Sequence, residues 1–150
     1  MLYKNCTQKP VRFTCDELKR FELIYENLRD LIEKHDASFE CQLKNALAEG
    51  YYINWRPQLH GSRKYGAVRL LEAALYEHND QAAVILIHSG ASVNVKPHNY
   101  KTLLYLAAKT NTSLDIFSEI LKRTHISKIN RKFYGTTVIS IFCVNYIDPV

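Results

Sequence analysis

The side chains most able to act as nucleophiles or metal ligands in this sequence are four cysteines and six histidines. Their spacing does not define a site, because no two cysteines form a Cys-x-x-Cys motif and no matching histidine pair follows them. We therefore expect buried free thiols and no metal. A metal site that combines Cys6, Cys15, His35 and Cys41 is the alternative. The fourth cysteine is Cys143, and the remaining histidines are His60, His78, His88, His98 and His125.

Catalytic motifs are missing from the sequence. There is no glycine-rich phosphate loop and no Gly-x-Ser-x-Gly elbow. Cys41 and His35 are six residues apart, so they would not share one face of a helix. Glu77 and Asp80 flank an expected turn, where solvated polar residues are normal. We expect no enzymatic activity and no cofactor.

A basic and aromatic segment, WRPQLHGSRKY, runs from Trp55 to Tyr65. Pro57 and Gly61 break regular structure there, so the segment is expected to be a long turn. A turn does not need a tryptophan unless the ring packs back onto a helix. Two interpretations of Trp55 therefore stay open, packing against a neighbouring helix and recognition of a partner.

The element that follows this turn, from Lys64 to Asn94, predicts two short helices joined by a tight turn. Leu70 and Leu71 lie on the apolar face of the first helix, and the run from Val84 to Ile87 belongs to the second. Gly90 ends that helix, where a left-handed residue is common. Such a unit cannot bury its apolar side alone and needs neighbours of the same kind.

Neighbours of this kind are present in the sequence. The exit Gly90-Ala91-Ser92-Val93-Asn94 recurs as Gly50-Tyr51-Tyr52-Ile53-Asn54 and, weakly, at 125–130. The asparagines at positions 54, 94 and 130 give periods of 40 and 36 residues. The opening at 66–74 aligns with 100–108 and again with 135–143, which pairs Ala73-Ala74 with Ala107-Ala108 and Arg69 with Leu103.

These copies resemble the ankyrin repeat, whose pattern joins Thr-Pro-Leu-His and Ala-Ala to an apolar helix ending in Gly-Ala-Asp-Val-Asn. The best matches are Gly90 to Asn94, Thr102 with Leu104, and Ala107-Ala108. The chain departs from the pattern because no copy keeps the Thr-Pro dipeptide or its histidine. The resemblance covers residues 38–144 and implies an all-α solenoid of about three to three and a half helix-turn-helix repeats with hairpin-like turns.

This organisation predicts a lead-in and capping helix over residues 1–37, then degenerate repeats at 38–61, 62–96, 97–131 and 132–150. Thr14-Cys15-Asp16-Glu17 fits a capping box for a helix that reaches about Lys34. Its apolar face is expected to cover the first repeat, with binding of a partner as the alternative. The final half repeat is expected to act as a cap or to dock on something outside the chain.

The resemblance also implies where a partner would bind, because hairpin tips and inner helices form the concave recognition face of the family. Carried over by position, this face includes both aromatic and basic residues, and aromatic residues are typical hot spots. With Trp55 from the long turn, the candidate partner-binding residues are Trp55, Lys64, Tyr65, Tyr76, His98, Lys101, Lys109, Lys132, Phe133 and Tyr134.

Composition is ordinary for a globular protein, with 47% apolar and 23% charged residues. The formal net charge of +5 lies in residues 61–150, which hold eleven Lys/Arg and six Asp/Glu. Such a field favours acidic partners. No apolar signal region follows Met1, and no run is long enough to span a membrane, so we expect a cytoplasmic or nuclear protein.

We therefore expect a protein–protein interaction module, an adaptor or inhibitor of a signalling complex or a pathogen mimic of one, that binds an acidic or mixed polypeptide as a monomer or in a hetero-complex. One alternative is an assembly subunit that docks through its N-terminal helix and apolar C-terminal end, on a scaffold or on another copy. A nucleic-acid-associated basic protein is another, although no nucleic-acid-reading motif is present.

Overall fold

A computed structural model describes residues 12–57, 67–94, 102–130, 132–133 and 135–147. In these ranges the chain is mostly helical, as the all-α prediction expected. The helices are α1 (Cys15–Glu33), α2 (Phe39–Ala48), α3 (Leu70–Tyr76), α4 (Asp80–His88), α5 (Leu103–Lys109), α6 (Leu114–Arg123), α7 (Ile126–Ile129) and α8 (Val138–Ile147). Two short antiparallel strands, β1 (Lys132–Phe133) and β2 (Thr136–Thr137), form a hairpin before α8.

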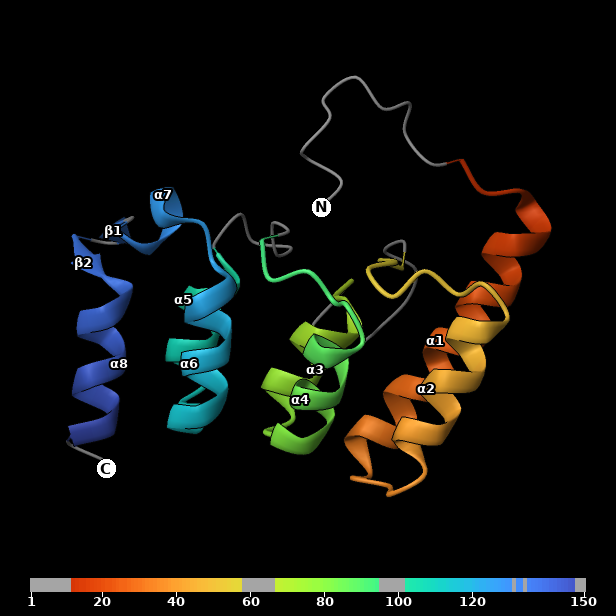
Figure 1. Cartoon of the computed structure of the whole chain (residues 1–150), viewed down its shortest axis with the longest axis horizontal. Helices are drawn as coiled ribbons and strands as arrows, with labels where there is room; N and C mark the ends of the chain where they lie inside the picture. The colour runs from red at the N-terminus through yellow and green to blue at the C-terminus, as the bar shows by residue number, and fades with distance from the viewer. Residues whose placement is uncertain (1–11, 58–66, 95–101, 131, 134, 148–150) are drawn as a thin grey trace.

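The helices stack in two rows (Figure 1). Helices α1, α3, α5 and α8 contact one another in sequence and form an inner row. Helices α2, α4 and α6 form an outer row, and each packs on the inner helix that precedes it in the chain. The described chain thus consists of three helix pairs, then the short α7 and the β-hairpin, and finally α8. The long helix α1 occupies the inner position of the first pair.

Local sequence explains where the helices begin and end. Thr14 and Glu17 form the expected capping box at the start of α1. Ser113 caps α6 by accepting a hydrogen bond from the Ile116 amide, as predicted. Gly50 and Gly90 follow α2 and α4 with φ angles of +94° and +101°, which a glycine adopts without a steric penalty.

The turns inside the helix pairs repeat the same backbone geometry. His35, His78 and Asn111 each follow an inner helix, with φ angles of +53°, +55° and +54°. Asparagine and histidine are enriched among non-glycine residues in this left-handed region. In each turn, the amide three residues after the helix, that of Asp36, Asn79 or Thr112, donates to a carbonyl five residues earlier, which closes the helix end tightly. A turn of the same conformation thus leads into each of the three outer helices.

These turns correct the predicted alignment of the repeats. The N-cap residues Arg69 and Thr102 each lie nine residues before the left-handed residue of their turn. Arg69 is therefore equivalent to Thr102, and the alignment that paired it with Leu103 is wrong by one residue. The alignment matched Ala73-Ala74 with Ala107-Ala108 because the two pairs are identical, but the N-cap positions determine the true register. The pairing of Thr102 with Thr137 agrees with the structure, where α8 begins at Val138.

Apolar residues fill the space between rows and layers, so that α3 and α5 are buried on nearly every side. At the α1 end, aromatic rings of α1 and of the segment that follows α2 form a cluster. Trp55 packs edge-on against Phe21 and Tyr25, with ring centroids 6.2 and 5.6 Å apart. Phe21 contacts Tyr51 in the same way at 5.4 Å. Helix α1 contacts α2, in the repeat that it was expected to cover, and it also contacts α3 of the second pair.

Two buried tyrosines in this cluster differ in how their hydroxyl groups are satisfied. The Tyr25 hydroxyl donates a hydrogen bond of 2.7 Å to the Val68 carbonyl oxygen, and burial raises the pKa of Tyr25 to about 12. Among the described residues, the Tyr51 hydroxyl has no hydrogen-bond partner although the residue is 4% exposed. Burial also raises the pKa of Tyr51.

We predict opposite effects of removing these two hydroxyl groups. Tyr25→Phe leaves the buried Val68 carbonyl unpaired and should lower the free energy of unfolding by about 1–3 kcal/mol. Tyr51→Phe removes a buried group that makes no bond, so it should leave stability unchanged or raise it by up to about 2 kcal/mol. Urea denaturation of both variants checks this, and equal losses would contradict the assignment.

Candidate protein-binding surface

The last residues of the inner helices form a row across the layers. With the register fixed by the turns, Glu33, Tyr76 and Lys109 occupy equivalent positions at the ends of α1, α3 and α5. Glu33 and Lys109 are exposed, and Tyr76 is partly buried against the core. Because neighbouring inner helices contact each other, the structure brings the predicted residues Tyr76 and Lys109 onto one strip of surface. We call Glu33, Tyr76 and Lys109 the inner-row strip.

Two other predicted residues lie in the β-hairpin at the start of α8. Lys132 is exposed and pairs across the hairpin with Thr137, and Phe133 pairs with Thr136. The hairpin precedes α8, whereas Tyr76 and Lys109 end their helices. Lys132 thus belongs to the opposite edge of the inner row from the inner-row strip.

Trp55 has a different place from the one predicted for a binding residue. Its side chain is 8% exposed and lies inside the aromatic cluster between α1 and the second pair. The packing interpretation agrees with this position, so Trp55 is removed from the candidate surface. The predicted residues Lys64, Tyr65, His98, Lys101 and Tyr134 lie outside the described residues.

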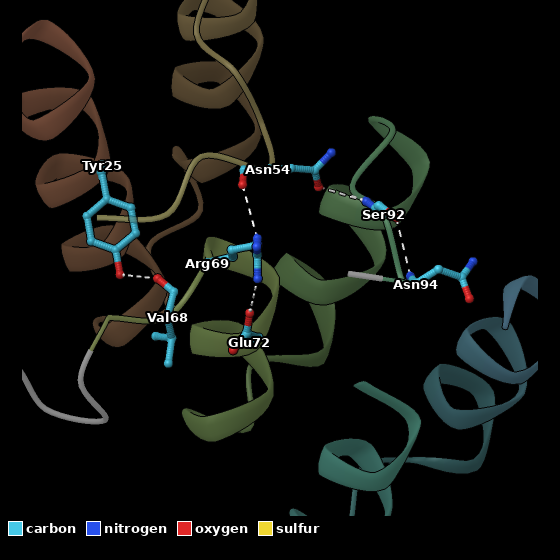
Figure 2. Close-up of polar contacts among 7 residues, drawn as sticks. All are labelled: Tyr25, Asn54, Val68, Arg69, Glu72, Ser92 and Asn94. Carbon is cyan, nitrogen blue, oxygen red and sulfur yellow. Dashed lines mark hydrogen bonds and ion pairs between the residues drawn. The ribbon is translucent and has the colours of Figure 1, made fainter. Parts of the chain in front are cut away.

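Hydrogen bonds from asparagine side chains hold the layers that carry this surface in register (Figure 2). Asn54 Oδ1, in the first pair, accepts a bond of 2.8 Å from the Ser92 amide in the second pair. Asn94 repeats this one layer further on, because its Oδ1 accepts from the His125 amide at 2.9 Å. Its Nδ2 also donates to the Arg123 carbonyl at 2.8 Å. Two of the periodic asparagines, Asn54 and Asn94, are thus connectors between consecutive pairs.

A second connection between layers centres on Arg69, which the sequence interpretation treated only as a departure from the repeat pattern. Arg69 Nε donates to the Asn54 carbonyl at 3.1 Å, and its Nη1 lies 3.3 Å from Glu72 Oε1 (Figure 2). Glu72 is 2% exposed. Burial raises the pKa of the Glu72 carboxyl, and the Arg69 charge and hydrogen bond oppose that rise. Only the helix register, which places Glu72 one turn after its cap, could have signalled this pair.

Several of the basic residues in the C-terminal half make internal contacts. Lys122 and Arg123 both pair with Glu119. These contacts lower the pKa of the Glu119 carboxyl, and the hydrogen bond from Arg123 contributes most. Lys128 donates to the Asn94 carbonyl. Part of the positive charge in this half is therefore engaged in ion pairs and hydrogen bonds within the chain.

The expectation of buried thiols is wrong for three cysteines. Cys15, Cys41 and Cys143 are free, as predicted, but they are exposed. Within the described ranges, no group of three or more His, Cys, Asp or Glu residues could hold a metal ion. In the same ranges, no helix combines the length and apolarity that crossing a membrane requires.

Comparisons with known proteins do not assign the chain to a family. No protein-family model matches the sequence, and a search of curated proteins found no significant match. The candidate surface therefore depends on the sequence pattern and the geometry described above.

We predict that Asn94 is needed for the last layers to stay attached. Asn94→Ala removes two hydrogen bonds from a residue that is 9% exposed, and should lower the free energy of unfolding by about 1–3 kcal/mol. Asn45→Ala, on the exposed side of α2, should change it by less than about 0.5 kcal/mol. Denaturation with hydrogen exchange of α5 to α8 checks this, and equal effects of the two variants would contradict the connector role.

We also predict a pH-dependent contribution of Glu72. Because the folded pKa lies above the ordinary value of 4.5, this group stabilises the fold most below that value, and the contribution is lost as the pH rises through the folded pKa. The free energy of unfolding of the native chain minus that of Glu72→Gln should thus be larger at about pH 4 than at about pH 7.5. Denaturation at both pH values measures this difference, in which the other carboxyl groups cancel. A difference that grows with pH would contradict the prediction.

Proposed function

We propose that this protein is a short, degenerate solenoid of the ankyrin-repeat type that binds a partner polypeptide through the inner side of its stack. The observation that carries the proposal is the repetition of one structural unit. The turns at His35, His78 and Asn111 share one conformation, and Asn54 and Asn94 make the same bond to the next layer. Repeat stacks of this kind present equivalent residues at regular intervals on a continuous surface.

Rigidity makes such a surface suitable for recognition. Inner helices α3 and α5 are buried on nearly all sides, and their ends are fixed by tight turns. Tyr76 and Lys109 therefore have little freedom of backbone movement to lose when a partner binds. A partly buried tyrosine next to an exposed lysine combines an aromatic anchor with a charge that steers acidic segments.

The inner-row strip also indicates the chemistry of the partner. Its three residues change from acidic Glu33 through aromatic Tyr76 to basic Lys109 along the stack. An extended or helical segment with an acidic residue near Lys109 and an apolar residue near Tyr76 would complement it. This chemistry fits a polypeptide of mixed charge better than a nucleic acid, whose phosphates would be repelled at Glu33.

The proposal predicts that partner capture depends on the inner-row strip. We expect the combined variant Tyr76→Ala, Lys109→Glu to lose partners that the native chain captures from cell lysate, because it removes the anchor and reverses the charge. The matched control is Lys19→Glu, which makes the same charge reversal at an exposed position of α1 and should retain those partners.

Two outcomes would contradict the proposal. Partners retained by the Tyr76, Lys109 variant would move the binding surface elsewhere. Partners lost after nuclease treatment, with affinity that falls steeply as salt rises, would indicate nucleic-acid binding instead. Circular dichroism of each variant separates loss of binding from loss of fold.

A further inference from the structure

Helix α8 is an inner-row helix whose face is left open where the equivalent faces of other layers are covered. Ile139 occupies the position of Leu71 and Leu104, counted from the helix start. Leu71 and Leu104 are 4% and 0% exposed, whereas Ile139 is 38% exposed. One turn further, Cys143 is exposed where Leu75 and Ala108 are 1% and 0% exposed.

The exposed side of α8 forms one continuous surface without charge. Ile139, Ser140, Cys143 and Val144 are exposed, and their spacing places them on one side of a helix. We call these four residues the α8 face. The sequence of α8, VISIFCVNYI, contains no Asp, Glu, Lys or Arg. A helix that is apolar all round is normally buried on all sides.

Helix α6 extends this apolar surface. Phe117 of α6 stacks on Phe142 of α8, with ring centroids 3.8 Å apart and planes 9° apart. Leu114 and Leu121 are neighbours of Phe117 on the α6 surface, three residues before and four after it. Leu114 is 50% exposed, and Leu121 is partly buried. The buried Phe117–Phe142 stack therefore joins α6 to α8 beneath the surface, and Leu114 adds exposed apolar area on α6.

We propose that a second copy of this chain docks on the α8 face, with α8 packed against α8 around a two-fold axis. A two-fold contact places the same patch on both sides. This patch has no charge to desolvate and no like charges to repel, although the whole chain has a formal net charge of +5. The small side chains of Ser140 and Cys143 allow two helices to approach closely.

Charge also decides the orientation of the second copy. A head-to-tail contact would place α1 of one copy on α8 of the other, but the exposed positions of α1 include Lys19, Arg20, Glu26 and Asp30. Burying these charges against an uncharged helix would be unfavourable. Lys122 and Arg123 of α6 both pair with Glu119, so these three side chains leave one of their two positive charges unbalanced.

The size of the contact predicts its strength. One ten-residue helix and the edge of α6 offer less than the roughly 800 Å² per partner of a standard stable interface. The dimer should therefore be weak and depend on protein concentration. This inference is independent of the inner-row strip, which shares no residue with the α8 face.

Sedimentation equilibrium of the full chain tests the proposal. The average mass should rise from one chain toward two between about 5 and about 500 µM. Val144→Glu and Ile139→Glu should each hold the mass at one chain across this range, because they bury a charge at the contact. The matched controls Leu23→Glu and Ile126→Glu change residues that are 73% and 79% exposed outside the α8 face, and should dimerise like the native chain.

A crosslinking experiment tests the geometry. In a chain with Cys6, Cys15 and Cys41 replaced by serine, a short bis-maleimide should join Cys143 to Cys143 of the second copy, and Val144→Glu should abolish that product. A native chain that stays monomeric at all concentrations would overturn the proposal, even if the α8 face bound an added amphipathic helix. A dimer unaffected by both α8 substitutions would overturn it as well.

Discussion

The structure depends on the hydrogen bonds that join one helix pair to the next. A short helix pair with apolar residues on several sides has no stable fold alone, so burial drives layers together without fixing their register. Asn54 and Asn94 fix the register, because the side-chain oxygen Oδ1 of each accepts a hydrogen bond from a backbone amide of the following layer. Arg69 adds a bond to the Asn54 carbonyl at the same junction. Hydrophobic contact supplies most of the stability, and these directional bonds determine how the layers are aligned.

Alignment of the layers connects the fold with the proposed function. Tyr76 and Lys109 become neighbours on one strip only because α3 and α5 begin and end at equivalent positions. The same regularity makes α8 conspicuous, since its positions equivalent to buried ones are exposed. The two proposals thus follow from one repeated geometry, with the strip on the inner side and the α8 face on the last layer.

The sequence predicted several helix starts and ends, because capping and left-handed turns are local. Thr14 with Glu17, Ser113, Gly50 and Gly90 all act as their neighbours in sequence indicated. Prediction was poorer wherever the result depended on tertiary contacts. Trp55 is buried because α1 happens to place Phe21 and Tyr25 beside it, which no local pattern reveals. The repeat alignment erred by one residue because alanine pairs match by identity, whereas the N-caps set the register. The pairing of Arg69 with Glu72 was missed as well, because that alignment did not place Arg69 at the N-cap of its helix.

The central claim is that the inner side of the stack binds a partner polypeptide, and crosslinking mass spectrometry of captured complexes tests it most directly. A lysine-reactive crosslinker should join the partner mainly to Lys109. Crosslinks to Lys132, at the other edge of the inner row, should be second to these. Lys19 and Lys44, exposed on α1 and α2, serve as internal references in the same sample. Crosslinks concentrated on Lys19 and Lys44, with none on Lys109, would contradict the account.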